Sequence, residues 1–176
     1  MRDVFSQKRR FSRSILGVDP GSSVTGYGII GLARKDWVLI DYGAIRTKNP
    51  NLSEKLKEVF DGLTKIIRKF HPDEFAIEEA FYSPAKGGAK TALVMGEVRG
   101  VAILAAVKSN LSVAEYSPKE IKSAVVGSGN ASKVQVQYMV KNLLKLKKIP
   151  TPTDASDALA VALCHLQKTQ DKRRIF

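Results

Sequence analysis

The chain has 176 residues, of which 44% are hydrophobic and 26% are charged. This length and composition are typical of one folded domain with its own core, and a single cysteine excludes a disulfide framework. The net charge of +12, from 29 basic and 17 acidic residues, favours a polyanionic partner, because each neutralised phosphate releases condensed counterions. Nucleic acid is the first candidate.

Zinc and thiol chemistry have little support in this sequence. His71 and His165 are far apart and show no zinc-ligand spacing. Cys164 lies in an Ala/Leu-rich stretch that predicts a buried, unreactive thiol. No apolar run approaches the ~20 residues that a membrane-spanning helix needs, so we expect a soluble protein. Carboxylates are therefore the candidates for any chemistry.

Short apolar runs predict five strands. Residues 1–13 come first; they are basic and without a long apolar core, which excludes a secretory signal and suits a disordered arm. The second and third strands are predicted to form a hairpin connected by residues 31–36. The predicted strands cover residues 15–18, 26–30, 37–42, 75–77 and 111–116.

Helical spacing of apolar residues predicts the helices between and after these strands. The first begins near Ser53, which we take as the N-cap, and Pro72 ends the pattern after Phe70. In the second helix, Gly96 and Gly100 are expected at a close contact with the sheet, because each glycine otherwise costs ~1 kcal/mol relative to Ala. The remaining helices are predicted over residues 89–109, 118–125, 132–146 and from 154 through 167. The whole pattern predicts a mixed sheet flanked by helices.

Acidic residues stand at two strand ends and at one helix start, where α/β proteins usually build a site. Asp19 follows the first strand, and Glu78 with Glu79 follows the fourth. Asp154 and Asp157 are three residues apart at the start of the last helix, so they project from one face. Such carboxylates could hold one or two hard cations, which would draw a phosphodiester into an otherwise repulsive site.

Each acidic position also has a purely structural explanation. Asp19-Pro20-Gly21 has turn chemistry, Asp154 can cap a helix, and Glu78 can be solvated surface. The glycine-rich segment 19–26 also suggests the phosphate loop of sugar-kinase or actin-like ATPases. Those ATPases have two related domains, whereas this chain is too short for both and shows no second acidic glycine-rich loop. The joint occurrence of the four carboxylates favours a cation site.

Several motifs, taken in order, resemble the RuvC-type Holliday-junction resolvases over roughly residues 14–168. Any one motif is moderately specific, and the ordered set is strongly specific. The motifs are Ile15-Leu16-Gly17-Val18-Asp19-Pro20-Gly21, Gly26-Tyr27-Gly28, Phe75-Ala76-Ile77-Glu78, Gly96-Glu97-Val98-Arg99-Gly100-Val101-Ala102, Glu115-Tyr116-Ser117-Pro118 through Lys122, and Asp154-Ala155-Ser156-Asp157-Ala158-Leu159-Ala160.

The resemblance implies a ribonuclease-H-like α/β fold with a mixed five-stranded sheet, and a homodimer that nicks four-way DNA junctions during recombination and repair. It implies two Mg²⁺ ions per subunit, which Mn²⁺ could replace, and ends that carry 5′-phosphate and 3′-hydroxyl groups. Two lysines would meet DNA phosphate near the site, and one aromatic residue would contact bases near the branch point. The implied catalytic and metal-binding residues are Asp19, Glu78, Asp154 and Asp157, and the implied DNA contacts are Lys122, Lys133 and Phe81.

Three segments follow from this comparison: a basic extension over residues 1–13, a nuclease domain over 14–168 and a short basic tail over 169–176. The extension and the stretch Tyr82 to Lys90 depart from the family pattern, so no DNA contacts are assigned there. The resemblance also implies a branch-migration complex of RuvA- and RuvB-type proteins as partner, and the missing export signal suggests the bacterial cytoplasm.

Two rival functions stay open at this point. One is a related ribonuclease-H-like nuclease with another substrate, such as an RNA–DNA hybrid. The other is a junction-binding protein without catalysis, although the presence of all four carboxylates argues against it. Cleavage of a junction, a hybrid and a plain duplex, with and without Mg²⁺, separates these possibilities.

Overall fold

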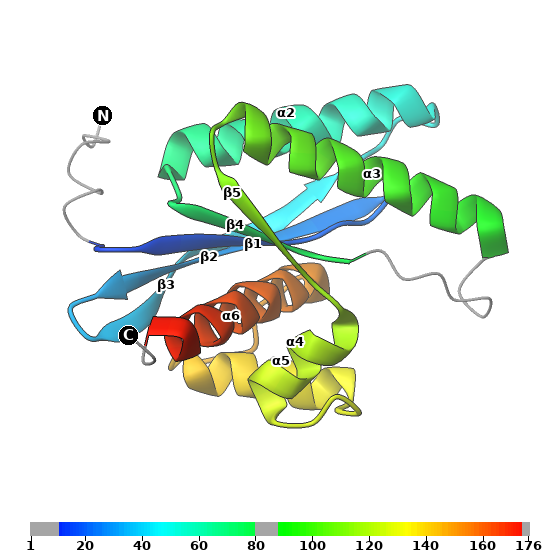
Figure 1. Ribbon diagram of the computed structural model, residues 1–176. Helices are drawn as coiled ribbons and strands as arrows, with labels where there is room; N and C mark the ends of the chain where they lie inside the picture. Colours follow the sequence, from blue (N-terminus) through cyan, green and yellow to red (C-terminus); the bar gives the residue numbers. More distant parts are fainter. Residues whose placement is uncertain (1–10, 80–87, 174–176) are drawn as a thin grey trace.

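A mixed five-stranded sheet forms the centre of the protein (Figure 1). The computed structural model describes residues 11–79 and 88–173. Across the sheet the order is β3-β2-β1-β4-β5; β2 is antiparallel to both β1 and β3, and β4 is parallel to both β1 and β5. The strands are β1 (Ser14–Asp19), β2 (Val24–Ala33), β3 (Asp36–Arg46), β4 (Glu74–Glu78) and β5 (Ser112–Tyr116). The predicted fold class is confirmed.

Helices cover both faces of this sheet. In Figure 1, α2 and α3 lie on one face and α6 lies on the other, where α4 and α5 pack against it. No helix within the described ranges is both long and apolar enough to cross a membrane. The helices are α2 (Leu52–Phe70), α3 (Gly88–Lys108), α4 (Pro118–Val126), α5 (Lys133–Leu143) and α6 (Thr153–Arg173).

Alternation along the strands divides the core into two layers, since successive side chains of a strand point to opposite faces. The layer under α2 and α3 contains large side chains such as Leu16, Phe75 and Ile77, all fully buried. The layer under α6 contains Ile15 and Ala76 from the strands. Residues of even number in β4 therefore face α6, and Glu78 is one of them.

The β2–β3 hairpin is longer than the sequence predicted. Only Arg34 and Lys35 connect the strands, and Arg34 has a left-handed φ of 57°. The predicted connection over 31–36 was wrong because it read Gly31 as a turn residue. Gly31 lies inside β2, where an added Cβ would come within 2.8 Å of Phe11 and 2.6 Å of Ile40. This glycine serves a close contact.

Helix α2 ends as predicted but begins differently. The N-cap is Asn51, so the assignment of Ser53 as the cap was wrong; Asn51 has extended backbone, and its carbonyl accepts the first helical bond from Lys55. At the other end His71 adopts a left-handed conformation, and its N–H donates to the carbonyl of Ile67. This cap closes the helix immediately before Pro72.

Helix α3 covers the predicted range but not through the predicted contact. Gly96 and Gly100 are exposed, and a Cβ at either position would meet nothing within 4 Å. The expected close approach of these glycines to the sheet was therefore wrong. The helix packs on the sheet with Val98 and Ala105, which are fully buried, and Leu104 is 50% exposed.

Helices α4 and α5 both begin with a reciprocal capping box. Ser117 pairs in this way with Glu120, and Ser132 with Gln135, so two backbone N–H groups are satisfied at each start. Helix α5 ends at Leu143, three residues earlier than predicted. Helical spacing predicts Leu143 on the inward side of this helix with Val136 and Val140, but the structure leaves it 40% exposed, so this prediction was wrong.

Buried polar groups connect the two ends of the chain at the start of β1. The Arg13 guanidinium donates to both carboxylate oxygens of Glu74 and to the hydroxyl of Thr169 on α6. His165 hydrogen-bonds the same carboxylate and the hydroxyl of Tyr116. Helix α6 continues past residue 168. The contacts of His165 and Thr169 hold its C-terminal half against the sheet.

Candidate active site

Two carboxylates meet at one edge of the sheet because their strands are neighbours and parallel. Asp19 ends β1 and Glu78 ends β4, and these strands pair over Ile15–Val18 and Glu74–Ile77. Side chains alternate along a strand, and both residues fall on the positions that point toward α6, as Ile15 and Ala76 do. The structure therefore has Asp19 and Glu78 at strand ends, as predicted.

The start of α6 lies over the same edge. Gly26 is the register partner of Asp19 in β2, and a Cβ on Gly26 would lie 2.0 Å from the carbonyl oxygen of Asp154. Asp154 stands in the first turn of α6, and Asp157 is one turn further along the same face. The structure thus brings together four acidic residues that are spread over more than one hundred positions of the sequence, from Asp19 to Asp157.

The electrostatics of Asp19 show how tightly these acids are gathered. The pKa of Asp19 is raised from 3.8 to about 8, first by burial and then by the charges of Glu78, Asp157 and Asp154. The ammonium group of Lys133 acts in the opposite direction. A carboxylate is costly here without a compensating cation, because burial and like charges both favour its neutral form.

Lys133 supplies one such cation from the first turn of α5. Its Nζ donates to Oδ2 of Asp157 at 2.6 Å, and this bond is the main reason why the pKa of Lys133 is raised. Burial nevertheless raises the pKa of Asp157, with a further contribution from Asp154, against the lowering effect of Lys133. One lysine therefore offsets the local negative charge only in part.

A cavity of about 360 Å³ opens among these groups. Asp19, Glu78 and Asp157 contribute the acidic part of its lining, while Lys122 of α4 and Lys133 contribute the basic part. Apolar side chains fill the rest of the wall. Acidic oxygens beside two ammonium groups suit a phosphate ester and the hard cations that accompany it.

The carboxylates have the right chemistry for a divalent cation, though not a ready-made geometry. Within residues 11–79 and 88–173, no three acidic, histidine or cysteine side chains are arranged as a metal-binding group. Hard cations such as Mg²⁺ prefer oxygen ligands, and four acidic residues gather here. Burial and three neighbouring acids raise the pKa of Asp19, and a bound cation would act against both effects. The donor set fits such a cation.

The other predicted positions have different outcomes. Lys122 and Lys133 both line the cavity, whereas Asp154 is not among its lining residues and acts on Asp19 through its charge. Glu79 is exposed just beyond the end of β4 and does not line the cavity. Phe81 lies outside the described residues.

Sequence reasoning missed the residues that place α6. A Cβ on Gly17 would lie 2.2 Å from the carbonyl oxygen of Ala158, and one on Gly28 would lie 2.5 Å from the side chain of Leu159. With Gly26, these glycines allow the helix backbone to approach the strands closely. The signal was present as one glycine in the first strand and two glycines, two positions apart, in the second, together with a helix rich in alanine later in the chain.

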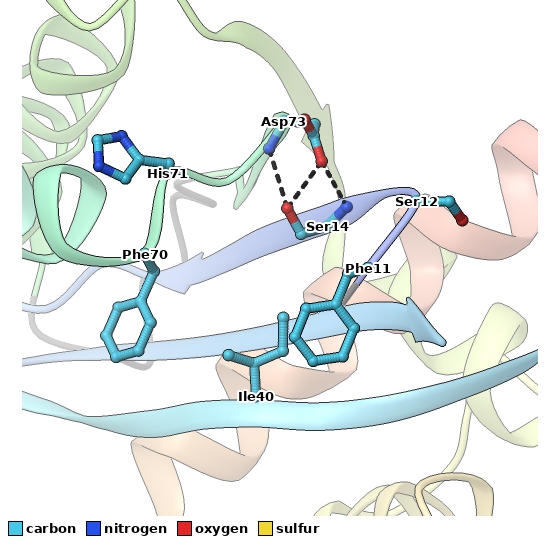
Figure 2. Close-up of a pocket in the computed structure, with 7 residues that line it drawn as sticks. All are labelled: Phe11, Ser12, Ser14, Ile40, Phe70, His71 and Asp73. Atoms are coloured by element: carbon cyan, nitrogen blue, oxygen red, sulfur yellow. Dashed lines mark hydrogen bonds between the residues drawn. The ribbon is translucent and has the colours of Figure 1, made fainter. Parts of the chain in front are cut away.

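A second cavity, of about 310 Å³, lies at the other end of β1 (Figure 2). Asp73 is its acidic residue, and this carboxylate already accepts hydrogen bonds from the N–H and hydroxyl of Ser14. Phe11, Ile40 and Phe70 form its apolar part. Its described lining residues include one occupied carboxylate and no lysine or arginine, so this part of the cavity lacks the chemistry of the first.

The sheet order, the acidic strand ends and the helix that closes over them define a ribonuclease-H-like nuclease. A profile of the crossover junction endodeoxyribonuclease RuvC family matches residues 15–165. The chain belongs to this RuvC family.

Two relatives support this assignment, and a third shares the fold. The crossover junction endodeoxyribonuclease RuvC of Shewanella pealeana is 53% identical over 156 residues, which is 89% of this chain and 88% of the relative. T. thermophilus RuvC, solved with a Holliday junction substrate, superposes with a TM-score of 0.83 at 27% identity, covering 91% and 96% of the two chains. The yeast mitochondrial Holliday junction resolvase Ydc2 has a TM-score of 0.69 at 15% identity, over 95% and 86%.

Proposed function

We propose that this crossover junction endodeoxyribonuclease cuts four-way DNA junctions in the acidic cavity, with Asp19, Glu78, Asp154 and Asp157 as its catalytic carboxylates. The observation that carries the proposal is the cavity in which Asp19, Glu78 and Asp157 lie beside two lysines, where burial and neighbouring acids raise the pKa of Asp19 to about 8. Such perturbed groups gather where chemistry is done. The junction-bound relative from T. thermophilus supports the choice of substrate.

The four carboxylates would hold divalent cations, Mg²⁺ by preference and two per subunit. When bound, such cations supply Lewis-acid stabilisation of the phosphodiester and lower the pKa of water. Asp19 is fixed by β1, Glu78 by β4, and Asp154 and Asp157 by the start of α6, so the ligands come from three rigid elements. Rigid placement reduces the reorganisation that the reaction needs.

The two lysines would place the scissile phosphate. Lys122 and Lys133 line the same cavity from α4 and α5, and Lys133 already contacts Asp157. An ammonium group beside a reacting phosphate stabilises charge that develops in the transition state. Hydrolysis arranged in this way would leave 5′-phosphate and 3′-hydroxyl ends.

Substitution of each carboxylate by its amide tests the proposal. Asp19→Asn, Glu78→Gln, Asp154→Asn and Asp157→Asn should each reduce the single-turnover rate of junction cutting by roughly 100-fold or more, on the scale of losing one electrostatic contact to the reacting groups. Junction affinity should largely survive, and calorimetry should show weaker Mg²⁺ binding. Glu79→Gln is the matched control, because Glu79 is exposed outside the cluster. Wild-type cutting by any of the four variants would remove that residue from the site.

The choice of substrate needs its own measurement. A four-way junction, an RNA–DNA hybrid and a plain DNA duplex of the same sequence should be offered at equal concentration with Mg²⁺ and with EDTA. We expect paired, symmetric nicks in the junction alone. Preference for the hybrid would make the protein a ribonuclease-H-like nuclease with another substrate. Binding without cutting would make it a junction-binding protein.

A homodimer through α3 would supply the second active site that paired nicking requires. One acidic cavity can treat one phosphate at a time, and closed two-fold symmetry is the commonest arrangement of soluble homo-oligomers. The outer side of α3 exposes Leu93 by 69%, Leu104 by 50% and Val107 by 54%. Gly96 and Gly100 add no side chain there, so a second helix could approach closely.

The oligomeric state can be tested at this surface. Leu104→Asp should convert the dimer to a monomer in light scattering, whereas Leu143→Asp, at an exposed leucine of α5, should not. Mixing wild-type with Asp19→Asn protein should give heterodimers that accumulate singly nicked junctions. A monomeric mass on the junction would end the proposal.

The cellular setting is also part of the proposal. The curated relatives are bacterial, which supports action in the bacterial cytoplasm beside a branch-migration complex of RuvA- and RuvB-type proteins. Retention of a tagged chain by such a complex on junction DNA would test this partnership.

A further inference from the structure

The outer face of α5 is exposed and combines apolar with basic side chains. At about 100° per residue, five side chains fall on adjacent positions of one side of the helix. Val134 is 70% exposed and Tyr138 is 55% exposed, while Val136 and Val140, on the adjoining inner side, are buried in the core. The set, here called the α5 face, is Lys133, Val134, Gln137, Tyr138 and Lys141.

The chain around this face carries only positive charge. Residues 121–153 contain six lysines and no aspartate or glutamate. Two of these lysines have acidic partners, since Lys133 bonds Asp157 and Lys145 bonds Asp36. On the α5 face itself, the Nζ of Lys141 lies 5.9 Å from the centre of the Tyr138 ring. The segment is suited to a polyanion.

The α5 face begins at the acidic cavity. Lys133, in the first turn of α5, lines the cavity, and Lys122 of α4 lies on the same lining. The rise from Lys133 to Lys141 is about 12 Å at ~1.5 Å per residue. This length matches roughly three to four nucleotides of one strand at ~3.4 Å each. A strand that leaves the cavity along α5 would therefore meet Tyr138 and Lys141.

We infer that the α5 face holds the DNA that leads away from the scissile phosphate, with Lys141 on a phosphate and Tyr138 against a base or deoxyribose. The inference rests on the proposed function for the position of that phosphate. Aromatic side chains among basic residues are the usual means of holding nucleic acid without reading its sequence. A protein partner fits less well, because lysine is depleted at protein–protein interfaces.

Two substitutions test separate parts of the inference. Junction affinity is measured by fluorescence anisotropy in EDTA, at several salt concentrations, so that no cutting occurs. Tyr138→Ala should raise the Kd about fivefold or more without changing its salt dependence, since stacking is not ionic. Tyr138→Phe should restore the affinity. Lys141→Ala should weaken binding and reduce the slope of log Kd against log salt by about one ion.

Matched controls keep these results specific. Lys65→Ala removes one exposed lysine from α2, on the other side of the sheet, and Asn142→Ala removes an exposed side chain of α5 outside the face. Both should bind like the wild type. Tyr138 and the control residues are exposed and Lys141 is half-buried, so circular dichroism and melting temperature should change little.

The outcomes separate this inference from the proposed function. At saturating junction and Mg²⁺, Tyr138→Ala should cut at the wild-type rate with a raised KM, whereas the carboxylate variants lose rate and keep affinity. Wild-type Kd and salt slope in both Tyr138→Ala and Lys141→Ala would overturn the inference. It would equally be overturned if these variants bound junctions normally and failed only with branch-migration proteins, because the face would then belong to a protein partner.

Discussion

The two faces of the sheet are built on different principles. Against α2 and α3 the strands present large side chains, with Leu16, Phe75 and Ile77 fully buried. Against α6 they present fewer large side chains, such as Ile15 and Ile30, and glycines where the helix comes closest: Gly17 lies under the carbonyl of Ala158, and Gly26 lies under that of Asp154. The first face fills volume with side chains, and the second brings two backbones together.

This difference separates the source of stability from the source of chemistry. Burying large apolar side chains contributes most of the favourable free energy of folding. Glycine and alanine bury little apolar area, so a glycine-rich face contributes less. The glycine-rich face instead positions the acids, because a helix that lies directly on the strands brings Asp154 and Asp157 close to Asp19. Substitutions at each face test this separation.

The largest effect on stability is expected from Phe75→Ala. Removing a fully buried phenylalanine costs about 3–5 kcal/mol of unfolding free energy. Phe75 points away from the acidic cavity, so the cutting rate of folded molecules should stay unchanged. Denaturant unfolding gives the first quantity, and single-turnover cutting well below the unfolding midpoint gives the second. Phe75→Leu provides a milder variant if alanine prevents folding. A large loss of rate in fully folded protein would show that the two faces are not separable.

Gly26→Ala should damage the chemistry more than the fold. The new Cβ would lie 2.0 Å from the Asp154 carbonyl, so the first turn of α6 must shift. Misplacing catalytic groups by about 1 Å costs about 100-fold in rate, whereas an overpacked core loses about 1–3 kcal/mol. Cutting, Mg²⁺ binding and unfolding should be measured together. Wild-type rates would mean that the close approach of α6 does not position the carboxylates.

Asp19→Asn should stabilise the protein while it abolishes cutting. The pKa of Asp19 is raised to about 8 in the folded state, from an ordinary 3.8. Between these values the folded protein binds more protons than the unfolded chain, so stability falls as pH rises through this window. In EDTA the variant should therefore be more stable at pH 8 by roughly 0.5–2 kcal/mol, and the difference should vanish near about pH 4. A variant less stable than the wild type at pH 8 would contradict this sign.

The smallest effect is expected from Gly100→Ala, which is also the control for Gly26→Ala. A Cβ on Gly100 meets nothing within 4 Å, and alanine is the better helix former by about 1 kcal/mol. The subunit should gain up to this amount and keep its cutting rate. Unfolding and light scattering should be followed in parallel. A weaker dimer of normally folded subunits would place the partner's helix at this glycine.

Much of the fold was predictable because its signals are local. Apolar runs and helical spacing depend on neighbouring residues, and they located all five strands and the helices between them. The four carboxylates were predictable for a related reason, since each stands at a boundary that local patterns mark. Strand ends such as Asp19 and Glu78 are read directly from where an apolar run stops.

What escaped prediction depends on partners far away in the chain. Gly31 and Gly96 look alike in sequence, yet one contacts Phe11 and Ile40 while the other has an open surface beside it. The bond between Lys133 and Asp157 joins two helices whose docking no local pattern describes. Ser53 is a good capping residue by type, but the backbone turned into the helix at Asn51.

Helix α6 comes after all five strands in the sequence, and this order has a consequence during protein synthesis. Asp19 and Glu78 are synthesised early, and the cluster is completed only when residues 154–157 have been made and α6 has docked on β1 and β2. Contacts this distant in sequence form late, because closing a long loop costs entropy before the contacts repay it. An unfinished polypeptide on the ribosome therefore carries half of the acids, and under the proposed function the ability to cut DNA arrives together with the last helix.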